Sequence, residues 1–112
     1  MSDELTQGLP TEDTVGAALR YLAKTDEAYA KAVAHKEAAE SRWKVERELA
    51  FLAAEGTVAE RTAQAMTSPG ARRAMDAYEA AIVELELLKA KRKRAELVIE
   101  VWRSLEASRR RA

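Results

Sequence analysis

Cysteine is absent from this chain of 112 residues, and long apolar runs are absent too. Without a thiol there is no disulfide, no thiolate metal ligand and no cysteine nucleophile, so a reducing compartment is permitted. The apolar runs span only a few residues, fewer than a membrane span needs, and the N-terminus is acidic where a secretion signal is basic. We therefore expect a soluble cytoplasmic protein without a membrane partner.

Glycine, proline and aromatic residues are scarce, with four, two and six copies respectively. Alanine, in contrast, contributes 24 residues. Because alanine is the best helix former but buries little area, this composition predicts long helices that pack closely rather than a bulky core. Most of the helix breakers lie in the two places where turns are expected anyway: Gly8, Pro10, Gly56, Pro69 and Gly70.

The first ten residues are polar and lack periodicity, so residues 1–10 are predicted to form a flexible arm. Thr11 is the expected N-cap of a first helix over about 12–54, because Glu12 and Asp13 place negative charge at the positive end of the helix dipole. Apolar residues in this segment recur at steps of 3, 4 and 7: Val15, Leu19, Leu22, Tyr29, Val33 and Trp43.

A break is predicted at Gly56, which suits the left-handed residue that closes a helix. The following Thr57-Val58-Ala59-Glu60 matches a capping box and predicts a short helix over about 58–66. The alternative is a first helix that continues through Gly56 at a cost of about 1 kcal/mol relative to alanine. We favour the break, and we expect three residues of the short helix to pack inward: Val58, Thr62 and Met66.

Ser68 and Pro69 are the expected N-cap and first residue of a last helix over about 69–108. One apolar stripe runs along it at steps of 3 and 4: Met75, Tyr78, Ile82, Leu85, Leu88, Arg92, Ala95, Ile99 and Trp102. A second set widens that stripe: Val83, Leu87, Leu97, Val98, Val101 and Leu105. A stripe this wide indicates that the helix contacts more than one neighbour.

These patterns predict an all-α fold: a long antiparallel helical hairpin, coiled-coil-like, with a short connecting helix, in a single domain over residues 11–112. The expected register sets Trp102 near Leu22, Ile82 near Trp43 and Arg92 near Val33. Because alanine-rich faces bury little area, we expect assembly into a helical-bundle oligomer. The residues predicted to pair helices within and between chains are Leu22, Tyr29, Trp43, Ile82, Leu85, Leu88, Ile99, Trp102 and Leu105.

Signals of catalysis are missing from the sequence. The single histidine, His35, has Lys31 and Ala39 at the helical spacing where further metal ligands belong, so we interpret it as a solvated side chain. Acidic residues are expected to form surface ion pairs with basic neighbours, such as Glu40 with Lys44 and Arg92 with Glu96. There is no phosphate-binding glycine loop and no Ser/His/Asp set. We expect no catalytic residues, no cofactor, no metal and no enzyme activity.

The net charge is zero but unevenly distributed, since the chain from Lys89 onward holds nine basic and three acidic residues. Such a cluster indicates contact with nucleic acid or with an acidic protein surface. These basic residues do not form a single stripe, because consecutive residues of a helix point around its whole circumference. Some of their side chains would therefore face the acidic first helix. The candidates for contact with nucleic acid or an acidic partner are Lys91, Lys93, Arg94, Arg109, Arg110 and Arg111.

Phe51 to Arg61 (FLAAEGTVAER), followed by Tyr78, Glu84-Leu85, the Lys89–Arg94 run and Trp102-Arg103-Ser104-Leu105, resembles small helical proteins of tailed bacteriophages and prophages. Their genes often lie among those for DNA recombination or single-strand annealing. The resemblance implies an accessory role near phage DNA metabolism in a bacterial cytoplasm, and it supplies no catalytic residue.

The leading hypothesis is therefore a non-enzymatic, self-associating helical protein that supports phage DNA recombination or replication through a protein partner, with auxiliary DNA contact. Two alternatives stay open at this stage. One is an inhibitor or adaptor that binds a host defence protein, and the other is a structural coiled-coil scaffold.

Overall fold

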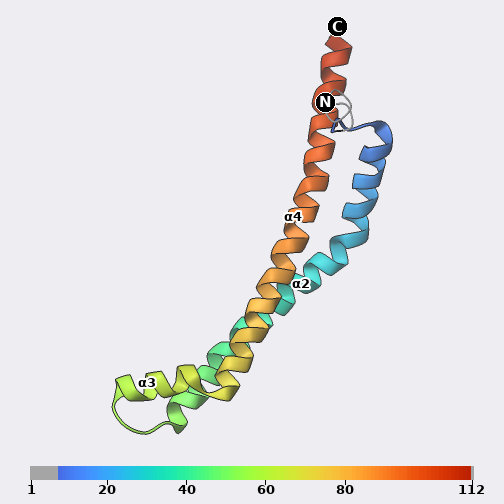
Figure 1. Ribbon diagram of the computed structural model, residues 1–112. Coiled ribbons are helices and arrows are strands. Elements are labelled where there is room, and N and C mark those ends of the chain that lie inside the picture. Colours follow the sequence, from blue (N-terminus) through green and yellow to red (C-terminus); the bar gives the residue numbers. More distant parts are fainter. Residues whose placement is uncertain (1–7, 112) are drawn as a thin grey trace. The chain divides into compact units, whose positions relative to one another are not determined.

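The computed structural model describes residues 8–111, and this part of the chain contains helices and no strand. They are α2 (Glu12–Ala53), the short α3 (Val58–Thr67) and α4 (Pro69–Arg111) (Figure 1). The predicted all-α class and the order of long, short and long helices are confirmed. The arm predicted over residues 1–10 lies mostly outside the described residues.

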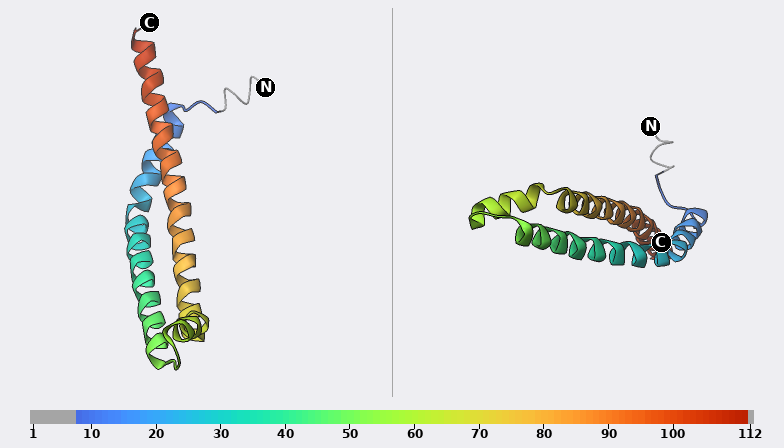
Figure 2. Two further views of the ribbon diagram at one scale, coloured as in Figure 1. Left: turned by 90° about the vertical axis from the view of Figure 1, so that its left-hand side faces the viewer. Right: turned by 90° about the horizontal axis from the view of Figure 1, so that it is seen from below.

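The chain divides into two compact units. Unit 1 joins the segment up to Tyr29 with the segment from Leu87 onward, and unit 2 comprises Ala30–Glu86. Within each unit, a segment of α2 and a segment of α4 lie side by side and run in opposite directions (Figures 1 and 2). The predicted antiparallel helical hairpin is therefore confirmed, whereas the single domain stays a prediction.

The start of α2 follows from a local cap. The Thr14 amide donates to the Thr11 hydroxyl at 3.3 Å, as expected for an N-cap. In return, the Thr11 amide donates to the Thr14 hydroxyl at 2.7 Å. Thr14 thus takes the place that glutamate or glutamine holds in a capping box.

The break between α2 and α3 also has the predicted chemistry. Gly56 has φ of +112°, and a Cβ at this position would lie 2.8 Å from a carboxylate oxygen of Glu60. Thr57 caps α3, because its hydroxyl accepts from the Glu60 amide at 3.2 Å. Ser68 caps α4 in the same way, accepting from the Ala71 amide at 3.3 Å. The continuous helix through Gly56 is therefore wrong.

The inward face of α3 differs from the prediction. Val58, Thr62 and Met66 are all exposed, and the buried residue of this helix is Ala65. The reason is that α3 turns the face that carries Arg61 and Ala65 inward, and Arg61 contacts the end of α2 as described below.

Small side chains form most of the core. Of the ten buried apolar residues within 8–111, eight are alanine, and the other two are Val15 and Leu85. On each long helix the buried and half-buried positions follow steps of 3 and 4, the pattern of helices paired along a seam. Alanine in the seam permits close approach of the helix axes but buries little area per residue.

The register differs from the prediction by about one helical turn. Trp43 stacks on Tyr78, with ring centroids 6.2 Å apart, and not on Ile82. Arg92 lies over the ring of Tyr29, 5.1 Å from its centroid, and not beside Val33. A repeating apolar seam matches itself after every turn, so its periodicity fixes which faces meet but not the alignment along the helices.

Candidate functional site

Arg92 is the most enclosed basic side chain in the cationic run, with only 16% of its side chain exposed. Its guanidinium donates to the Leu22 carbonyl at 3.0 Å and to the Thr25 hydroxyl at 2.7 Å. A further nitrogen lies 2.7 Å from a carboxylate oxygen of Asp26. Together with its position over the Tyr29 ring, these bonds make Arg92 a link between α2 and α4 within unit 1.

The predicted ion pair between Arg92 and Glu96 is therefore wrong, because the acceptors on α2 hold the guanidinium. Glu96 lies instead 3.9 Å from the ammonium of Lys93. The predicted pair of Glu40 with Lys44 is confirmed at 3.0 Å.

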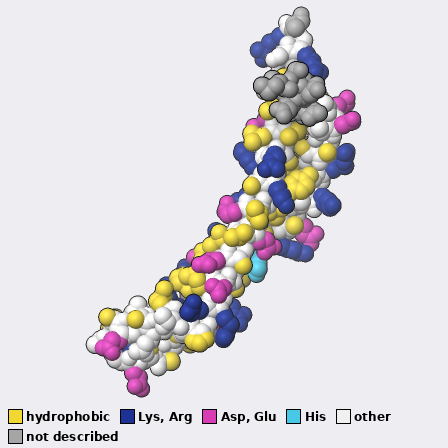
Figure 3. Space-filling view, viewed as in Figure 1, with side chains coloured by type: hydrophobic (Ala, Val, Ile, Leu, Met, Phe, Trp, Pro, Cys, Tyr) yellow, Lys and Arg dark blue, Asp and Glu magenta, His cyan; other side chains and the backbone are white. Residues whose placement is uncertain are grey.

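The other basic candidates lie at the surface. Arg109 lies 2.8 Å from Glu106, one turn back along α4. Figure 3 shows Lys and Arg side chains near the C-terminal end of α4 on the face in view. The exposed candidates for contact with an anionic partner are Lys91, Lys93, Arg94, Arg109, Arg110 and Arg111.

The residues predicted to pair helices are enclosed to different degrees. Leu85 is buried at 3% exposure. The others are half-buried: Leu22, Tyr29, Trp43, Ile82, Leu88, Ile99, Trp102 and Leu105. The guanidinium of Arg47 lies 4.5 Å from the ring centroid of Trp43, which further covers that side chain. Two of them make contacts between α2 and α4: Trp43 stacks on Tyr78, and Tyr29 lies under Arg92.

Other large apolar side chains face outward and have no cover in the structure. In unit 2, α2 exposes Val45, Leu49 and Leu52, and α4 exposes Val83 at 57%. In unit 1, α4 exposes Leu87, Leu97 and Val101 at 59%, 45% and 43%. Figure 3 shows apolar side chains reaching the surface between charged ones in both units. Exposed apolar surface of this kind is typical of interaction sites.

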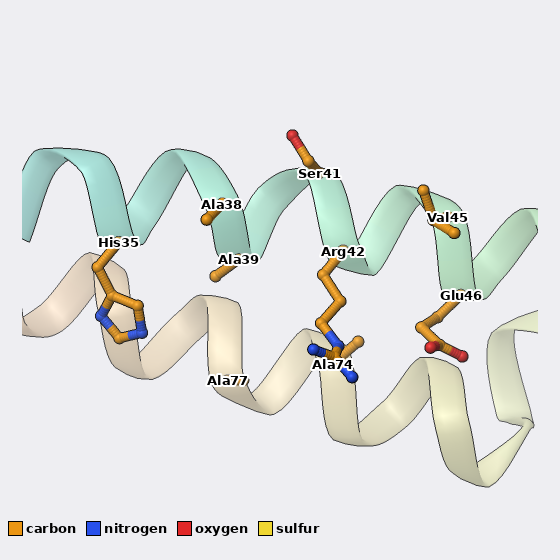
Figure 4. A pocket seen from close by; sticks show the side chains of 9 residues that line it. All are labelled: His35, Ala38, Ala39, Ser41, Arg42, Val45, Glu46, Ala74 and Ala77. Carbon is orange, nitrogen blue, oxygen red and sulfur yellow. The ribbon is translucent and has the colours of Figure 1, made fainter.

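Unit 2 also contains an open groove of about 730 Å³ between α2 and α4 (Figure 4). The side chains of His35, Arg42 and Glu46 extend from α2 toward α4, whereas Ser41 points away. The floor of the groove is made of small apolar residues: Ala38, Ala39, Ala74 and Ala77. Such a floor provides apolar contact without directional polar groups.

His35, which lines the groove, lies beside a carboxylate of α4. His35 Nδ1 lies 3.5 Å from Glu84 Oε2, and the two side chains are 59% and 62% exposed. Water screens a pair this exposed, whereas a catalytic acid or base depends on a desolvated setting. Within residues 8–111, no three His, Cys, Asp or Glu side chains are grouped so as to hold a metal ion.

Glu40 is a carboxylate with a perturbed acidity. The Lys44 ammonium, which donates to it at 3.0 Å, lowers the pKa of Glu40 below its ordinary value. A hydrogen bond from Tyr78 acts in the same direction. A lowered pKa keeps this carboxylate ionised, which suits a surface ion pair more than proton transfer near neutral pH.

The chain matches no protein-family model, no curated protein and no solved structure in the comparisons made. No helix in the described part of the chain combines the length and apolar character of a membrane span.

Arg61 is a structural residue that the sequence did not indicate. Its Nε and Nη2 each donate to the Phe51 carbonyl at 3.2 Å, and its guanidinium lies 4.4 Å from the Phe51 ring centroid. Phe51 is in the last turn of α2, which has no basic residue of its own. Arg61 therefore supplies the positive charge that the carbonyl end of a helix favours.

Proposed function

We propose that this chain is a non-enzymatic helical interaction protein that associates with itself and, through a protein partner, serves as an accessory factor in phage DNA recombination or replication in the bacterial cytoplasm. The phage setting rests on the resemblance of the FLAAEGTVAER turn and the terminal WRSL. The mode of action rests on the surface of the helices.

The observation that carries the proposal is the outward-facing apolar set on α4 in unit 1: Leu87, Leu97 and Val101. All three lie off the seam with α2, and each is more than 40% exposed. Fully burying an exposed side chain of this size contributes about 1.5–3 kcal/mol, and about half of that remains to be gained here because each side chain is already about half covered. A second helix laid along this face would gain that contribution.

The alanine-rich core supports the same proposal. Burial of alanine contributes less than burial of leucine, and in the described residues no large side chain is fully buried. An isolated copy therefore buries little apolar area for its length. Association with further helices is the usual remedy for a slender helical pair.

Light scattering after size-exclusion chromatography tests self-association directly. The chain has a mass of 12.4 kDa, so a dimer or closed bundle elutes with a small integral multiple of that mass. A constant 12.4 kDa at every concentration up to the millimolar range contradicts the proposal. Large open polymers instead favour a structural scaffold.

A second candidate function, DNA contact, is favoured by the exposed basic residues of α4. Contacts with phosphates release counterions, so binding through them weakens steeply as salt rises. We expect Lys91→Glu with Arg94→Glu to weaken binding to single- or double-stranded DNA further. The matched control is Arg20→Glu with Lys24→Glu on α2, two exposed basic residues outside the basic run. Absence of binding to both DNA forms at low salt eliminates this candidate.

A further inference from the structure

The groove of unit 2 continues into an exposed apolar track on α2. Ala38 and Val45 line the groove, and Leu49 and Leu52 follow Val45 on the same side of α2 at steps of 4 and 3. The two leucines are 56% and 63% exposed. From Ala38 to Leu52 the track spans about 21 Å, at 1.5 Å per residue, and it lies wholly within unit 2. A track of this length suits another helix more than a small molecule.

Two guanidinium groups flank the groove. Arg42 extends from α2 toward Ala74 of α4 (Figure 4), and Arg73 of α4 lines, together with Arg42, an adjoining hollow of about 190 Å³. Both arginines are exposed, and within residues 8–111 neither forms an ion pair. An apolar surface beside two unpaired cations is complementary to a surface that sets carboxylates beside apolar side chains.

The carboxylates around the groove have other neighbours. Glu46 lies beside the first turn of α4, because a Cβ at Gly70 would be 3.1 Å from its Oε2, and the positive end of a helix dipole favours an acid there. Glu84 lies 3.5 Å from His35. The two arginines are therefore the charges of this groove that remain for a partner.

We propose, building on the protein partner proposed above, that this groove and the apolar track of α2 dock an amphipathic helix of that partner, one with acidic residues beside its apolar stripe. The apolar stripe lies on the alanine floor and on Val45, Leu49 and Leu52, and the carboxylates pair with Arg42 and Arg73. The small side chains of the floor permit close approach of the incoming helix.

A synthetic helical peptide of about 15 residues is the probe, because that length covers the track. It carries leucine at steps of 3 and 4 among alanines, with glutamate beside the leucine stripe. The matched control peptide has lysine in place of every glutamate. Fluorescence anisotropy measures the binding of each labelled peptide to the full chain. The glutamate peptide is expected to bind roughly ten-fold more tightly than the lysine peptide, since like charges facing each other oppose docking.

Charge reversal on the protein locates the site. Arg42→Glu with Arg73→Glu is expected to weaken binding of the glutamate peptide by roughly ten-fold and to reverse the preference, so that the lysine peptide binds more tightly; exposed pairs are individually weak, but reversal turns each attraction into a repulsion. Both side chains are exposed, so the circular dichroism spectrum is expected to stay unchanged. The matched control is Lys91→Glu with Arg94→Glu in unit 1, which is expected to leave peptide binding unchanged.

The apolar track has a separate test. Leu49→Ser with Leu52→Ser removes two exposed apolar side chains and is expected to weaken binding of both peptides by the same factor. Unchanged binding of both peptides to this variant overturns the part of the proposal that extends the site along α2.

A reversed preference in the Arg42→Glu, Arg73→Glu variant supports the proposal. Equal binding of the two peptides to the unaltered chain, or weakening by the unit 1 control alone, overturns it. Binding of neither peptide to a chain that self-associates overturns this docking site and leaves self-association standing. Loss of self-association in the Arg42→Glu, Arg73→Glu variant overturns the proposal in favour of a second copy in the groove. A monomeric chain that binds the glutamate peptide overturns self-association alone.

Discussion

Arg92→Ala is predicted to destabilise the fold, although Arg92 belongs to a run of basic residues that would ordinarily be interpreted as a ligand-binding surface. Its side chain is 16% exposed and donates to a carbonyl, a hydroxyl and a carboxylate on α2. Hydrogen bonds from a charged group contribute about 1.5–3 kcal/mol each when their acceptors are buried.

Arg92→Ala is not expected to cost the summed free energy of these hydrogen bonds, because the acceptors on α2 keep other partners. Asp26 is 68% exposed and is hydrated when the guanidinium is removed, and the Thr25 hydroxyl already donates to the Tyr21 carbonyl at 2.8 Å. We therefore expect Arg92→Ala to lower the free energy of unfolding by about 2–3 kcal/mol, including lost packing of the aliphatic stem. Arg92→Met keeps the stem and is expected to cost about 1 kcal/mol.

Urea unfolding followed by circular dichroism measures these differences, with all variants at one protein concentration because association contributes to apparent stability. Lys91→Ala, the exposed neighbour, is the matched control and is expected to change the free energy by less than about 0.5 kcal/mol. If Arg92→Ala costs no more than Lys91→Ala, the guanidinium does not link α2 to α4 and the reasoning is refuted.

Three further predictions concern the ends and surface of α2. Arg61→Ala is expected to cost about 1–2 kcal/mol in urea unfolding, because the Phe51 carbonyl loses two donors, and Arg61→Lys is expected to recover only part of it. Gly56→Ala is expected to cost about 1–2 kcal/mol, since φ of +112° is strained for any residue with a Cβ; an unchanged midpoint contradicts this. The Glu40 carboxyl is expected to titrate by NMR below the ordinary glutamate pKa, and Lys44→Ala to raise that midpoint. Since the folded pKa is the lower one, the stabilisation from this pair is present above the ordinary pKa and is lost as pH falls through the lowered value.

The helix ends were predictable because their signals are local. Thr11, Thr57 and Ser68 each cap a helix within three residues of their own position, and Gly56 takes the backbone conformation that glycine favours. Periodicity likewise predicted the pairing of the long helices and the excess apolar width of α4.

Features that depend on distant residues were not predictable from the pattern. The register is set by contacts such as Trp43 on Tyr78, which a repeating seam accommodates at several alignments. Arg61 reaches a carbonyl ten residues away, across the turn, so that the face of α3 with Arg61 and Ala65 lies inward. Arg92 gave a partial signal, since it occupies a seam position at which an apolar residue is expected, and this spacing distinguishes it from Lys91, Lys93 and Arg94.

The central claim is that the chain associates with itself through the exposed apolar face of α4 in unit 1, and sedimentation equilibrium tests it most directly. The unaltered chain is compared with Leu87→Ser plus Leu97→Ser, which removes two exposed apolar side chains from that face. The account predicts a mass that is a small multiple of 12.4 kDa for the unaltered chain and a mass nearer 12.4 kDa for the variant at the same concentration. A mass of 12.4 kDa for both chains, or the same multiple for both, contradicts the claim.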